Sequence, residues 1–550
     1  MLAGPGRATV DVRRNWARRL TAVALGVGLV LAGAASAQAA NKPVNIGTPY
    51  ESGPPAVTVD SGGNAVVAWA NTKDLAGAAN FVQYCVLPVG ATMCKESGSL
   101  IPADSAQYID GVQVLVEGGT YVILADVYGT AGNDSRDYIP EQEWQSTDGG
   151  GTWTIIDNGL SVTNGIIDAD TAPLSAVTVP GSGVLGYGWN TAGGSPPTFN
   201  AFPLSSPPEC STQTCAAGYA SLEPASNPDQ IGNAGGQFAS STSSKDPGVL
   251  AIFNTLFTNG PLACTQSFGT AYAFGSGDQS ASNNYNLSPG QAGSAWVKPV
   301  TQADCNVEYP AVAGGPAGYG VLETDLGNNT TVYHPFDLSN DSFDTKLVKL
   351  ASDGEEQPGL SMDAGRGVYA TYLLGGVGGP IDLSYSPNGG STWATASINA
   401  DKDGGISNQS NAVNGTGQGW STWTDNGSVF AEPFTGVNAL CGPAVGSKGS
   451  SNGKTAKLTL SCSSYPAKLA VALTATKKGK TIKLGAGTFS LAKKSSKSVT
   501  LSGPGKSFIK SHPGHVKVTA DLAERLGSYS VGGKHAVTLK VSLPSSHHHT

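Results

Sequence analysis

Carboxylate side chains are the residues of this chain whose type and spacing could perform acid–base chemistry. Two carboxylates that flank a glycosidic bond can hydrolyse it, one as the acid and the other as the base or nucleophile. The candidates are Glu141 and Glu143, Asp168 and Asp170, and Glu308 with its neighbour Tyr309. The alternative is that these acids only cover loops, because residues 41–440 contain 37 Asp and Glu against 10 Lys and Arg.

Tryptophan rings are a second possible source of ligand contacts, because an aromatic face can stack on a sugar. The candidates for stacking are Trp69, Trp144, Trp189 and Trp423, with Trp420 close to the last of them. The alternative is that these rings pack between strands, as large aromatic side chains do in protein cores. The sequence leaves both interpretations open.

Metal and cofactor chemistry is not indicated by the sequence. His334 is the only histidine between residues 41 and 440, which argues against a histidine-activated nucleophile or a zinc site there. The segment from Asp401 to Gly405 has part of a calcium-loop spacing but lacks the later acidic ligand. We therefore expect a turn there, and neither a metal nor a cofactor in the protein.

The eight cysteines fall into four pairs of near neighbours. The pairs are Cys85 with Cys94, Cys210 with Cys215, Cys264 with Cys305, and Cys441 with Cys462. An even set of closely spaced cysteines in an exported protein favours disulfides. We predict these four bridges from proximity, while other connectivities remain open.

Two stretches share the pattern Ser-x-(Asp/Asn)-x-Gly-x-Thr-Trp, which predicts a hairpin turn. They run from Ser146 to Trp153, with Asp148 and Gly150, and from Ser386 to Trp393, with Asn388 and Gly390. The Asp or Asn can bond its own backbone, the Gly can take a positive φ, and the Trp can close onto the strands. We therefore expect structural roles for these residues.

The pattern resembles the Asp-box, or BNR repeat, of sialidases and related β-propellers. This resemblance implies an all-β propeller, in which Trp153 and Trp393 are structural, but it identifies a fold device and not a reaction. As a family, sialidases hold the substrate carboxylate with three arginines. They use a Tyr/Glu pair as the nucleophile and an Asp as the acid/base.

The sialidase arginines cannot be assigned in this chain. After residue 40 the arginines are Arg136, Arg366 and Arg525, and the last of these lies in the basic C-terminal part. The Arg-Ile-Pro motif of the family is also absent, since the nearest string runs from Asp137 to Pro140. Lysine does not replace the guanidinium fork in bidentate carboxylate recognition. Sialidase chemistry is therefore not expected.

A weaker repeat recurs along the chain: an apolar strand, a Gly-rich turn and a second apolar strand. Its copies are 56–69, 112–128, 174–189, 238–254, 310–322, 359–372 and 411–423. The spacing of these copies fits four-stranded propeller blades with long outer loops. Seven copies are present whereas sialidases have six blades, so six and seven blades both remain open.

Composition divides the chain into three parts. Residues 1–40 combine arginines, an apolar run and a small-residue cleavage signal at Ala39 or Ala40, which predicts a signal peptide and export. Residues 41–440 carry a net charge of −27, and residues 441–550 carry +15. We place the domain boundary at Cys441, where a Gly- and Ser-rich linker begins the basic domain.

The basic domain, residues 441–550, has strand-like runs in which apolar and polar positions alternate. These runs are 457–462, 468–474, 481–484, 498–501, 515–519 and 535–541, and 521–526 is expected to form a helical turn or two. The alternation predicts a half-buried antiparallel β-sandwich. The layout loosely resembles the Ig-like C-terminal modules of secreted actinobacterial proteins. We expect one basic surface from Lys477, Lys478, Lys480, Lys483, Lys493, Lys494 and Lys497.

Together these features predict an exported all-β monomer: a six- or seven-bladed sialidase-like propeller followed by a small Ig-like sandwich. The expected function is binding of a carbohydrate or another polymer, including anionic envelope polymers, at the cell envelope or outside the cell. One alternative is an exo-acting glycoside hydrolase that uses a carboxylate pair. Another is a propeller with a structural or protein-interaction role. No specific nucleic-acid partner and no membrane span are expected.

Overall fold

A computed structural model of the protein describes most of the chain between residues 42 and 543. The described residues are 42–47, 54–71, 81–102, 108–128, 141–156, 175–179, 184–191, 195–203, 220–221, 236–240, 248–257, 267–276, 307–315, 318–325, 330–337, 342–343, 347–352, 354–374, 379–398, 405–440, 442–462, 467–526 and 529–543. The predicted signal peptide lies outside them. Nowhere in these ranges is there a helix with the length and apolar character that a membrane crossing requires.

Most strands form small antiparallel sheets whose members follow one another along the chain. The sheets are β2 (Ala56–Val59), β3 (Ala65–Asn71), β4 (Phe81–Leu87) and β5 (Glu96–Leu100); β6 (Tyr108–Glu117), β7 (Thr120–Tyr128), β8 (Glu141–Ser146) and β9 (Thr154–Ile156); β10 (Ser175–Val179), β11 (Val184–Thr191), β12 (Ser195–Pro203) and β13 (Ala220–Ser221); β14 (Gly236–Ser240), β15 (Gly248–Phe257) and β16 (Ser267–Ser276); β17 (Val307–Gly315), β18 (Gly318–Asp325), β19 (Thr330–Asp337), β20 (Ser342–Phe343) and β21 (Val348–Ala351); β22 (Gly354–Met362), β23 (Val368–Leu374), β24 (Ile381–Ser386) and β25 (Ala394–Ser397); and β26 (Ile406–Val413), β27 (Gln418–Asp425), β28 (Ser428–Thr435) and β1 (Val44–Gly47). Each predicted repeat coincides with the first two strands of one sheet.

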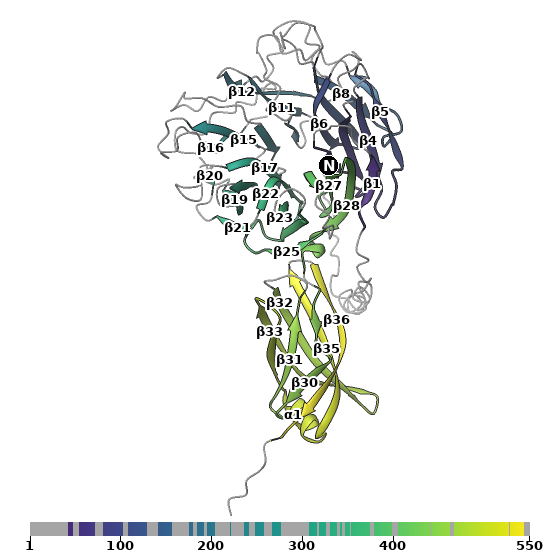
Figure 1. The fold of residues 1–550 in the computed structure, drawn as a ribbon, viewed down its shortest axis with the longest axis vertical. Helices are drawn as coiled ribbons and strands as arrows, with labels where there is room; N and C mark the ends of the chain where they lie inside the picture. Colours follow the sequence, from purple (N-terminus) through teal and green to yellow (C-terminus); the bar gives the residue numbers. More distant parts are fainter. Residues whose placement is uncertain are drawn as a thin grey trace, which may run out of the picture. The chain divides into compact units, whose positions relative to one another are not determined.

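The small sheets follow one another in a closed ring. Each first strand contacts the first strand of the next sheet, and β26 of the last sheet contacts β2 of the first. The N-terminal strand β1 pairs antiparallel with β28, so that Val44 lies opposite Ala431. Figure 1 shows these sheets as separate groups of arrows, coloured from purple to green. Four-stranded meanders around a ring are the architecture of a β-propeller, as the sequence predicted.

The core of the propeller lies between neighbouring sheets. Strand β3 packs against two of them, which explains why nearly all residues of β3 are apolar. Alternate side chains of a strand point to opposite faces. On one face, Val66 and Ala68 pack with Trp144 of the next sheet. On the other, Val67 and Trp69 pack with residues of the last sheet. Because both faces are covered, every residue of β3 is buried.

The remaining strands form one eight-stranded sheet, drawn from green to yellow in Figure 1. They are β29 (Ala444–Val445), β30 (Lys448–Ser451), β31 (Thr455–Ser461), β32 (Ala467–Lys477), β33 (Lys480–Leu491), β34 (Ser495–Thr500), β35 (Gly514–Leu526) and β36 (Tyr529–Val541). The sheet wraps around a single core that includes Leu458, Leu473 and Leu539. Its ends approach each other where Gly485 bridges to Leu501.

Two expectations for this basic part are wrong. Residues 521–526 are not helical but continue β35, because burial alternates along the strand and Leu522 points into the core. Instead, a helix missed by the sequence analysis, α1 (Gly503–Lys510), begins where the Ser502 side chain accepts from the Gly505 N–H at 3.2 Å. The sheet is also not wholly antiparallel, since β30 and β36 run parallel.

The first residue of β36, Tyr529, contacts the last two propeller sheets. Tyr529 lies edge-on to Tyr385 with ring centroids 5.1 Å apart, and its hydroxyl is 3.3 Å from that of Tyr369. Burial is the main cause that raises the pKa of Tyr369 far above its usual value. Residues 42–550 form one compact unit by contacts, so the boundary at Cys441 stays a prediction.

Candidate functional site

The first Asp-box forms the predicted turn between β8 and β9. The Ser146 hydroxyl donates to Asp148 Oδ1 at 2.8 Å and accepts from the Gly150 N–H at 2.9 Å. The backbone N–H and the hydroxyl of Thr152 donate to the Asp148 carboxylate at 2.9 and 2.8 Å. These bonds to Thr152, followed by the one from Ser146, lower the pKa of Asp148 to about 2. The turn is therefore tied together by a carboxylate that stays ionised.

The second box, between β24 and β25, repeats this network around a neutral amide. The Ser386 hydroxyl donates to Asn388 Oδ1 at 3.0 Å and accepts from the Gly390 N–H at 2.8 Å. The Thr392 N–H donates to Asn388 Oδ1 at 2.9 Å. Gly390 has a φ of 94°, a conformation that favours glycine. The two boxes thus differ in charge and share their geometry.

Each box tryptophan packs against a tyrosine of the preceding sheet. Trp153 meets Tyr84 of β4 edge-on with ring centroids 5.1 Å apart. Trp393 meets Tyr333 of β19 in the same way at 5.0 Å. The boxes therefore join neighbouring sheets as well as turning the chain.

The turns between first and second strands lie at the same edge of the sheets as the boxes, which we call the box edge. In one sheet the Gly389 N–H donates to the Arg366 carbonyl at 3.0 Å, so box and turn touch. This turn is held by Asp363, whose Oδ1 accepts the N–H groups of Gly365 and Gly367, both at 2.7 Å. Arg366, a positive-φ residue, is exposed here.

The turn at Asp60 connects three sheets at the box edge. Its carboxylate accepts the Asn64 N–H at 2.8 Å and the Tyr121 hydroxyl at 2.8 Å, and its carbonyl accepts from Asn414 Nδ2 at 3.0 Å. Burial acts to raise the pKa of Asp60, but the bonds from Asn64 and Tyr121 outweigh it and lower that pKa. Burial and Asp60 raise the pKa of Tyr121 to about 12. The box edge is thus a connected hydrogen-bonded layer.

The opposite edge, where the first strands begin, is built differently, and we call it the loop edge. Four first strands carry extra residues close to their start. There is one in β6 between Ile109 and Val112, in β17 between Glu308 and Ala311, and in β26 between Ser407 and Ser410, and there are two in β22 between Glu355 and Gly359. Such bulges re-aim side chains and are frequent beside active sites. In β26 the bulge holds Asn408 at a φ of 52°.

Polar residue types occupy these bulges. Asp110 lies in the β6 bulge, Tyr309 in that of β17 and Glu356 in that of β22, placed here by backbone position alone. In β26, Gln409 is buried and its Nε2 donates to the Thr371 carbonyl at 2.9 Å. The loop edge thus gathers acidic and amide residues from strands far apart in sequence.

The structure brings part of the predicted carboxylate set to the loop edge. Glu308 and Tyr309 begin β17, and Glu141 begins β8. Glu143 follows in β8, where its side chain is buried and accepts from Gln145 Nε2 at 2.6 Å. The Asp168 and Asp170 pair lies outside the described residues, in the segment that joins β9 to β10. Their catalytic roles stay predictions.

Three of the four tryptophans considered for sugar stacking have no free face. Trp69 and Trp144 are each 2% exposed and Trp423 is 1% exposed. Trp69 Nε1 donates to Gln83 Oε1 at 3.0 Å, and Trp423 stacks on Phe430 with centroids 5.9 Å apart. Their burial favours the interpretation that these rings pack between strands. The same holds for Trp420, which is 1% exposed. For Trp189 only the backbone of β11 is described.

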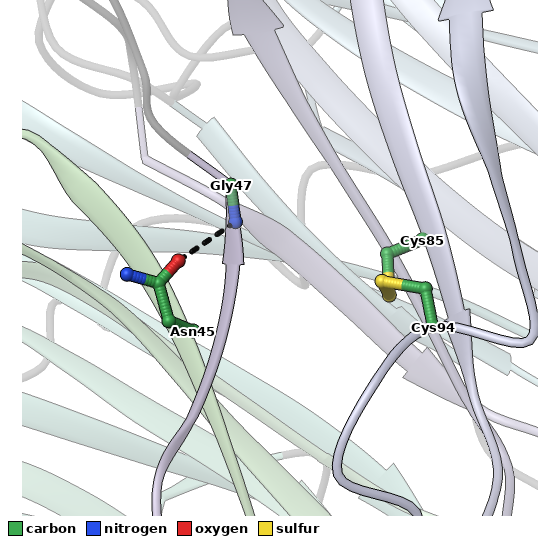
Figure 2. Close-up of a disulfide and its surroundings, with 4 residues drawn as sticks. All are labelled: Asn45, Gly47, Cys85 and Cys94. Atoms are coloured by element: carbon green, nitrogen blue, oxygen red, sulfur yellow. Dashed lines mark hydrogen bonds between the residues drawn. A yellow bond between two sulfur atoms is a disulfide. The ribbon is translucent and has the colours of Figure 1, made fainter.

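One predicted disulfide is confirmed, between Cys85 of β4 and Cys94 just before β5. Figure 2 shows it near β1, in which the Gly47 N–H donates to Asn45 Oδ1 at 3.2 Å. Cys462 is also disulfide-bonded. Its predicted partner Cys441, and the pairs Cys210 with Cys215 and Cys264 with Cys305, lie outside the described residues.

Acidic and histidine side chains form no metal cluster within the ranges described. No group of three or more His, Cys, Asp or Glu side chains is suited to a metal there, and Asp401 and Asp403 fall outside those ranges. His334 instead lies 2.7 Å from Glu323, and both side chains are buried. The pair lies within the β18–β19 hairpin, and Glu323 lies opposite the bulge near the start of β17.

Glu432 is a buried acid that sequence analysis did not single out. It lies on β28 opposite Ser421, which in turn lies opposite Asn411 on β26. Glu432 is 2% exposed and its Oε2 has no hydrogen-bond partner. Burial raises its pKa to about 8. Because Asn411, Ser421 and Glu432 are all buried, the row lies in the interior and is not a surface site.

The bulges had a sequence signal that the repeat analysis passed over. Pro310 and Pro358 stand inside two of the first strands, where proline is tolerated only at an edge or a bulge. Both first strands also lie at a sheet edge, because each pairs with only one neighbouring strand. Their edge position is therefore a second reason why proline is tolerated there. The β6 and β26 bulges contain no proline and had no such signal.

Comparison with known proteins gives fold-level similarity at low identity. No protein-family model and no curated protein matches the chain. Among solved structures, an ulvan lyase from a new polysaccharide lyase family is 10% identical, covers 72% of this chain and 96% of its own, and has a TM-score of 0.41. A mutant NanB sialidase from Streptococcus pneumoniae is 10% identical over 71% of this chain and 69% of its own, with a TM-score of 0.34. A family 117 glycoside hydrolase from Zobellia galactanivorans is 12% identical over 71% and 89%, with a TM-score of 0.27. These proteins are all carbohydrate-active by their descriptions, but at such TM-scores the similarity carries no argument about this chain's activity.

Proposed function

We propose that the chain is an exported, monomeric seven-bladed propeller that binds a carbohydrate or another polymer at the cell envelope or outside the cell. The small Ig-like β-sandwich that follows it begins at Cys441. The binding site in this proposal is the loop edge. The observation that supports it is the recurrence of a bulge at the start of β6, β17, β22 and β26.

Bulges at equivalent positions are better explained by ligand contact than by folding. A bulge interrupts the hydrogen-bonded ladder and re-aims side chains, and bulges are over-represented at sheet edges and next to active sites. The first strands contact one another around the ring. Bulged residues from several sheets therefore converge on the same region. Hydroxyl and amide groups of a glycan suit such a set of acids and amides.

The net negative charge of residues 41–440 limits which classes of glycan we expect to bind. With 37 acidic and 10 basic residues in this region, an anionic glycan approaches against a repulsive field. Only two arginines, Arg136 and Arg366, are present to pair with carboxylates, and Arg366 lies at the box edge. A neutral or amine-bearing glycan is therefore the ligand class that fits.

A binding screen tests the proposal. Residues 41–550 are applied to an array of neutral, amino and acidic glycans, together with the variant Asp110→Asn/Glu308→Gln. The matched control is Glu96→Gln, an acid of β5 at the box edge. We expect binding to neutral or amino glycans that falls at least tenfold in the double variant and is unchanged in the control. Equal binding by all three proteins would contradict a site at the loop edge.

Glycoside hydrolysis is the second candidate, because two neighbouring first strands carry glutamates at their bulges. Strands β17 and β22 contact each other, and they contain Glu308 and Glu355. Two carboxylates roughly 5–10 Å apart on either side of a glycosidic bond would suffice. The ligand found on the array is incubated with the protein, and release of reducing ends is measured. Release that Glu308→Gln and Glu355→Gln each abolish would establish an enzyme, and binding without release would leave a binding protein.

A further inference from the structure

One end of the eight-stranded sheet gathers helix α1 and the turn between β32 and β33. The register pairs Lys477 with Lys480 at that turn and Gly514 with Val541 where β35 begins. Strand β32 pairs antiparallel with β35, so both features lie at the same end. Because α1 contacts β33 and directly precedes β35, it lies there too. We call this the α1 end.

Lysine is the dominant side chain of the α1 end. The exposed lysines there include Lys454, Lys477, Lys478, Lys480, Lys506 and Lys510. Residues 441–550 contain only two acids, Asp521 and Glu524. The register places Glu524 opposite Leu469, toward the other end of β35. The lysines at the α1 end therefore have no acidic neighbour from this sheet.

The structure corrects the single basic surface expected from sequence. Lys493 and Lys494 follow β33, whereas Lys477 and Lys480 precede or begin it. A strand rises about 3.3 Å per residue, so a strand of 12 residues separates the two groups by roughly 35–40 Å. Lysines distant in sequence, from the turn before β31 and from α1, replace Lys493 and Lys494 in the cluster.

The acidic propeller does not neutralise this cluster. Tyr529, which contacts the propeller, begins β36 at the opposite end of the sheet. Strand β35 has 13 residues, so the two ends are roughly 40 Å apart, several times the Debye length of about 8 Å at physiological salt. The charge of the α1 end is therefore available to a partner outside this chain.

We propose that the α1 end binds a linear polyanion, a polymer with a phosphate or carboxylate group in each repeat. Lysine ammonium groups are flexible, strongly hydrated point charges, which suit many interchangeable contacts better than one shaped ligand. A chain of regularly spaced anions relieves the mutual repulsion of several lysines at once. This surface is separate from the loop edge and does not rest on the glycan binding proposed for it.

The test uses residues 41–550 and two polyanions, long-chain polyphosphate and polygalacturonate, with vesicles containing anionic lipid as a third probe. The variant Lys477→Glu/Lys480→Glu is compared with the matched variant Lys493→Glu/Lys494→Glu, which changes the same charge at the other end of β33. Thermal unfolding verifies that both variants fold. Dissociation constants are measured at low and at high salt.

We expect binding of at least one polymer that weakens at least tenfold as salt rises. The Lys477→Glu/Lys480→Glu variant should lose at least tenfold in affinity at low salt, and the matched variant less than threefold. Equal losses of affinity in the two variants would show that binding depends on the net charge of the protein and not on the α1 end, which would overturn the proposal. Binding to vesicles alone would identify a lipid surface and overturn it as well, as would the absence of binding to any probe. Binding to the loop edge is scored separately with the Asp110→Asn/Glu308→Gln variant.

Discussion

The box edge and the loop edge of the same sheets are organised by opposite rules. At the box edge, turns in several sheets repeat one solution, in which an Asp or Asn side chain such as Asp148, Asn388 or Asp363 accepts from nearby backbone N–H groups. At the loop edge, four first strands depart from regular pairing within a few residues of their start. The turns of the box edge hold the sheets together, whereas the bulges of the loop edge interrupt strand pairing at the place where we propose that the ligand binds.

The interior tryptophans give the sharpest test of this division. Trp69 is 2% exposed and packs between two sheets. Replacement of a buried Trp by Ala costs about 3–5 kcal/mol. We expect Trp69→Ala to lower the free energy of unfolding by that amount in urea titrations. Loss of glycan binding with unchanged stability would instead support a stacking role and break the comparison.

The buried Glu432 should make the interior sensitive to alkaline pH. Its pKa is raised from 4.5 to about 8 by burial. Its contribution to stability is therefore complete below about pH 4.5 and is lost as the pH rises through about 8, because ionisation then places a charge in the buried interior. With 1.36 kcal/mol for each pKa unit, the loss approaches about 5 kcal/mol.

The variant Glu432→Gln removes this titration. We expect its free energy of unfolding to vary less between pH 5 and pH 9 than that of the parent protein, as measured by urea titration at several pH values. The exposed-edge variant Glu96→Gln serves as the control and should follow the parent. If Glu432→Gln also follows the parent, a polar partner satisfies the carboxylate.

Substitutions at the two box glycines can distinguish the cost of lost close packing from the cost of backbone strain. Gly389 and Gly390 have φ angles of 68° and 94°, and an added Cβ would meet nothing at Gly389 but would collide with the Tyr333 ring at Gly390. We expect Gly389→Ala to cost about 1 kcal/mol from strain, and Gly390→Ala about 3 kcal/mol from strain and overpacking. Thermal unfolding measures both. Equal costs would show that the box does not hold its sheet against the preceding one.

The charge difference between the two boxes predicts the smallest effect. The pKa of Asp148 is lowered to about 2 from 3.8 by its hydrogen bonds. Its contribution is therefore present above about pH 3.8 and is lost as the pH falls through about 2. The melting temperature of Asp148→Asn should lie slightly below that of the parent at pH 6, and the two should converge near pH 2. The variant Asn388→Ala, which removes a neutral amide, should show no such convergence.

Local patterns in the sequence predicted the fold well, because the features concerned are determined within a few residues. Ser146 to Trp153 contains both partners of every hydrogen bond in its turn except those to other sheets. The alternation in β32 likewise predicted its half-buried character. Helix α1 was missed because Gly503, Pro504 and Gly505 at its start are typical turn residues.

The candidate site was predicted less well, because it depends on contacts between distant segments. The burial of Trp69 is decided by residues of the last sheet, including Trp420. The bulges in β6 and β26 are visible only once their pairing with β7 and β27 is known. The wrong helix at 521–526 has the same origin, since two neighbouring strands impose extended backbone on a segment of good helix formers.

The pairing of β1 with β28 has a consequence for the order of folding. Val44 is among the first described residues to leave the ribosome, yet its partner Ala431 follows only after every other sheet of the ring. Contacts this distant in sequence slow folding, because the entropy of loop closure is lost before the stabilising contacts between the strands can form. The ring therefore stays open, with β1 unpaired, until β28 has been synthesised and has joined β1 after any threading across a membrane. Closure is the last step, and it completes the folded ring only once the whole of residues 42–435 has reached the same compartment.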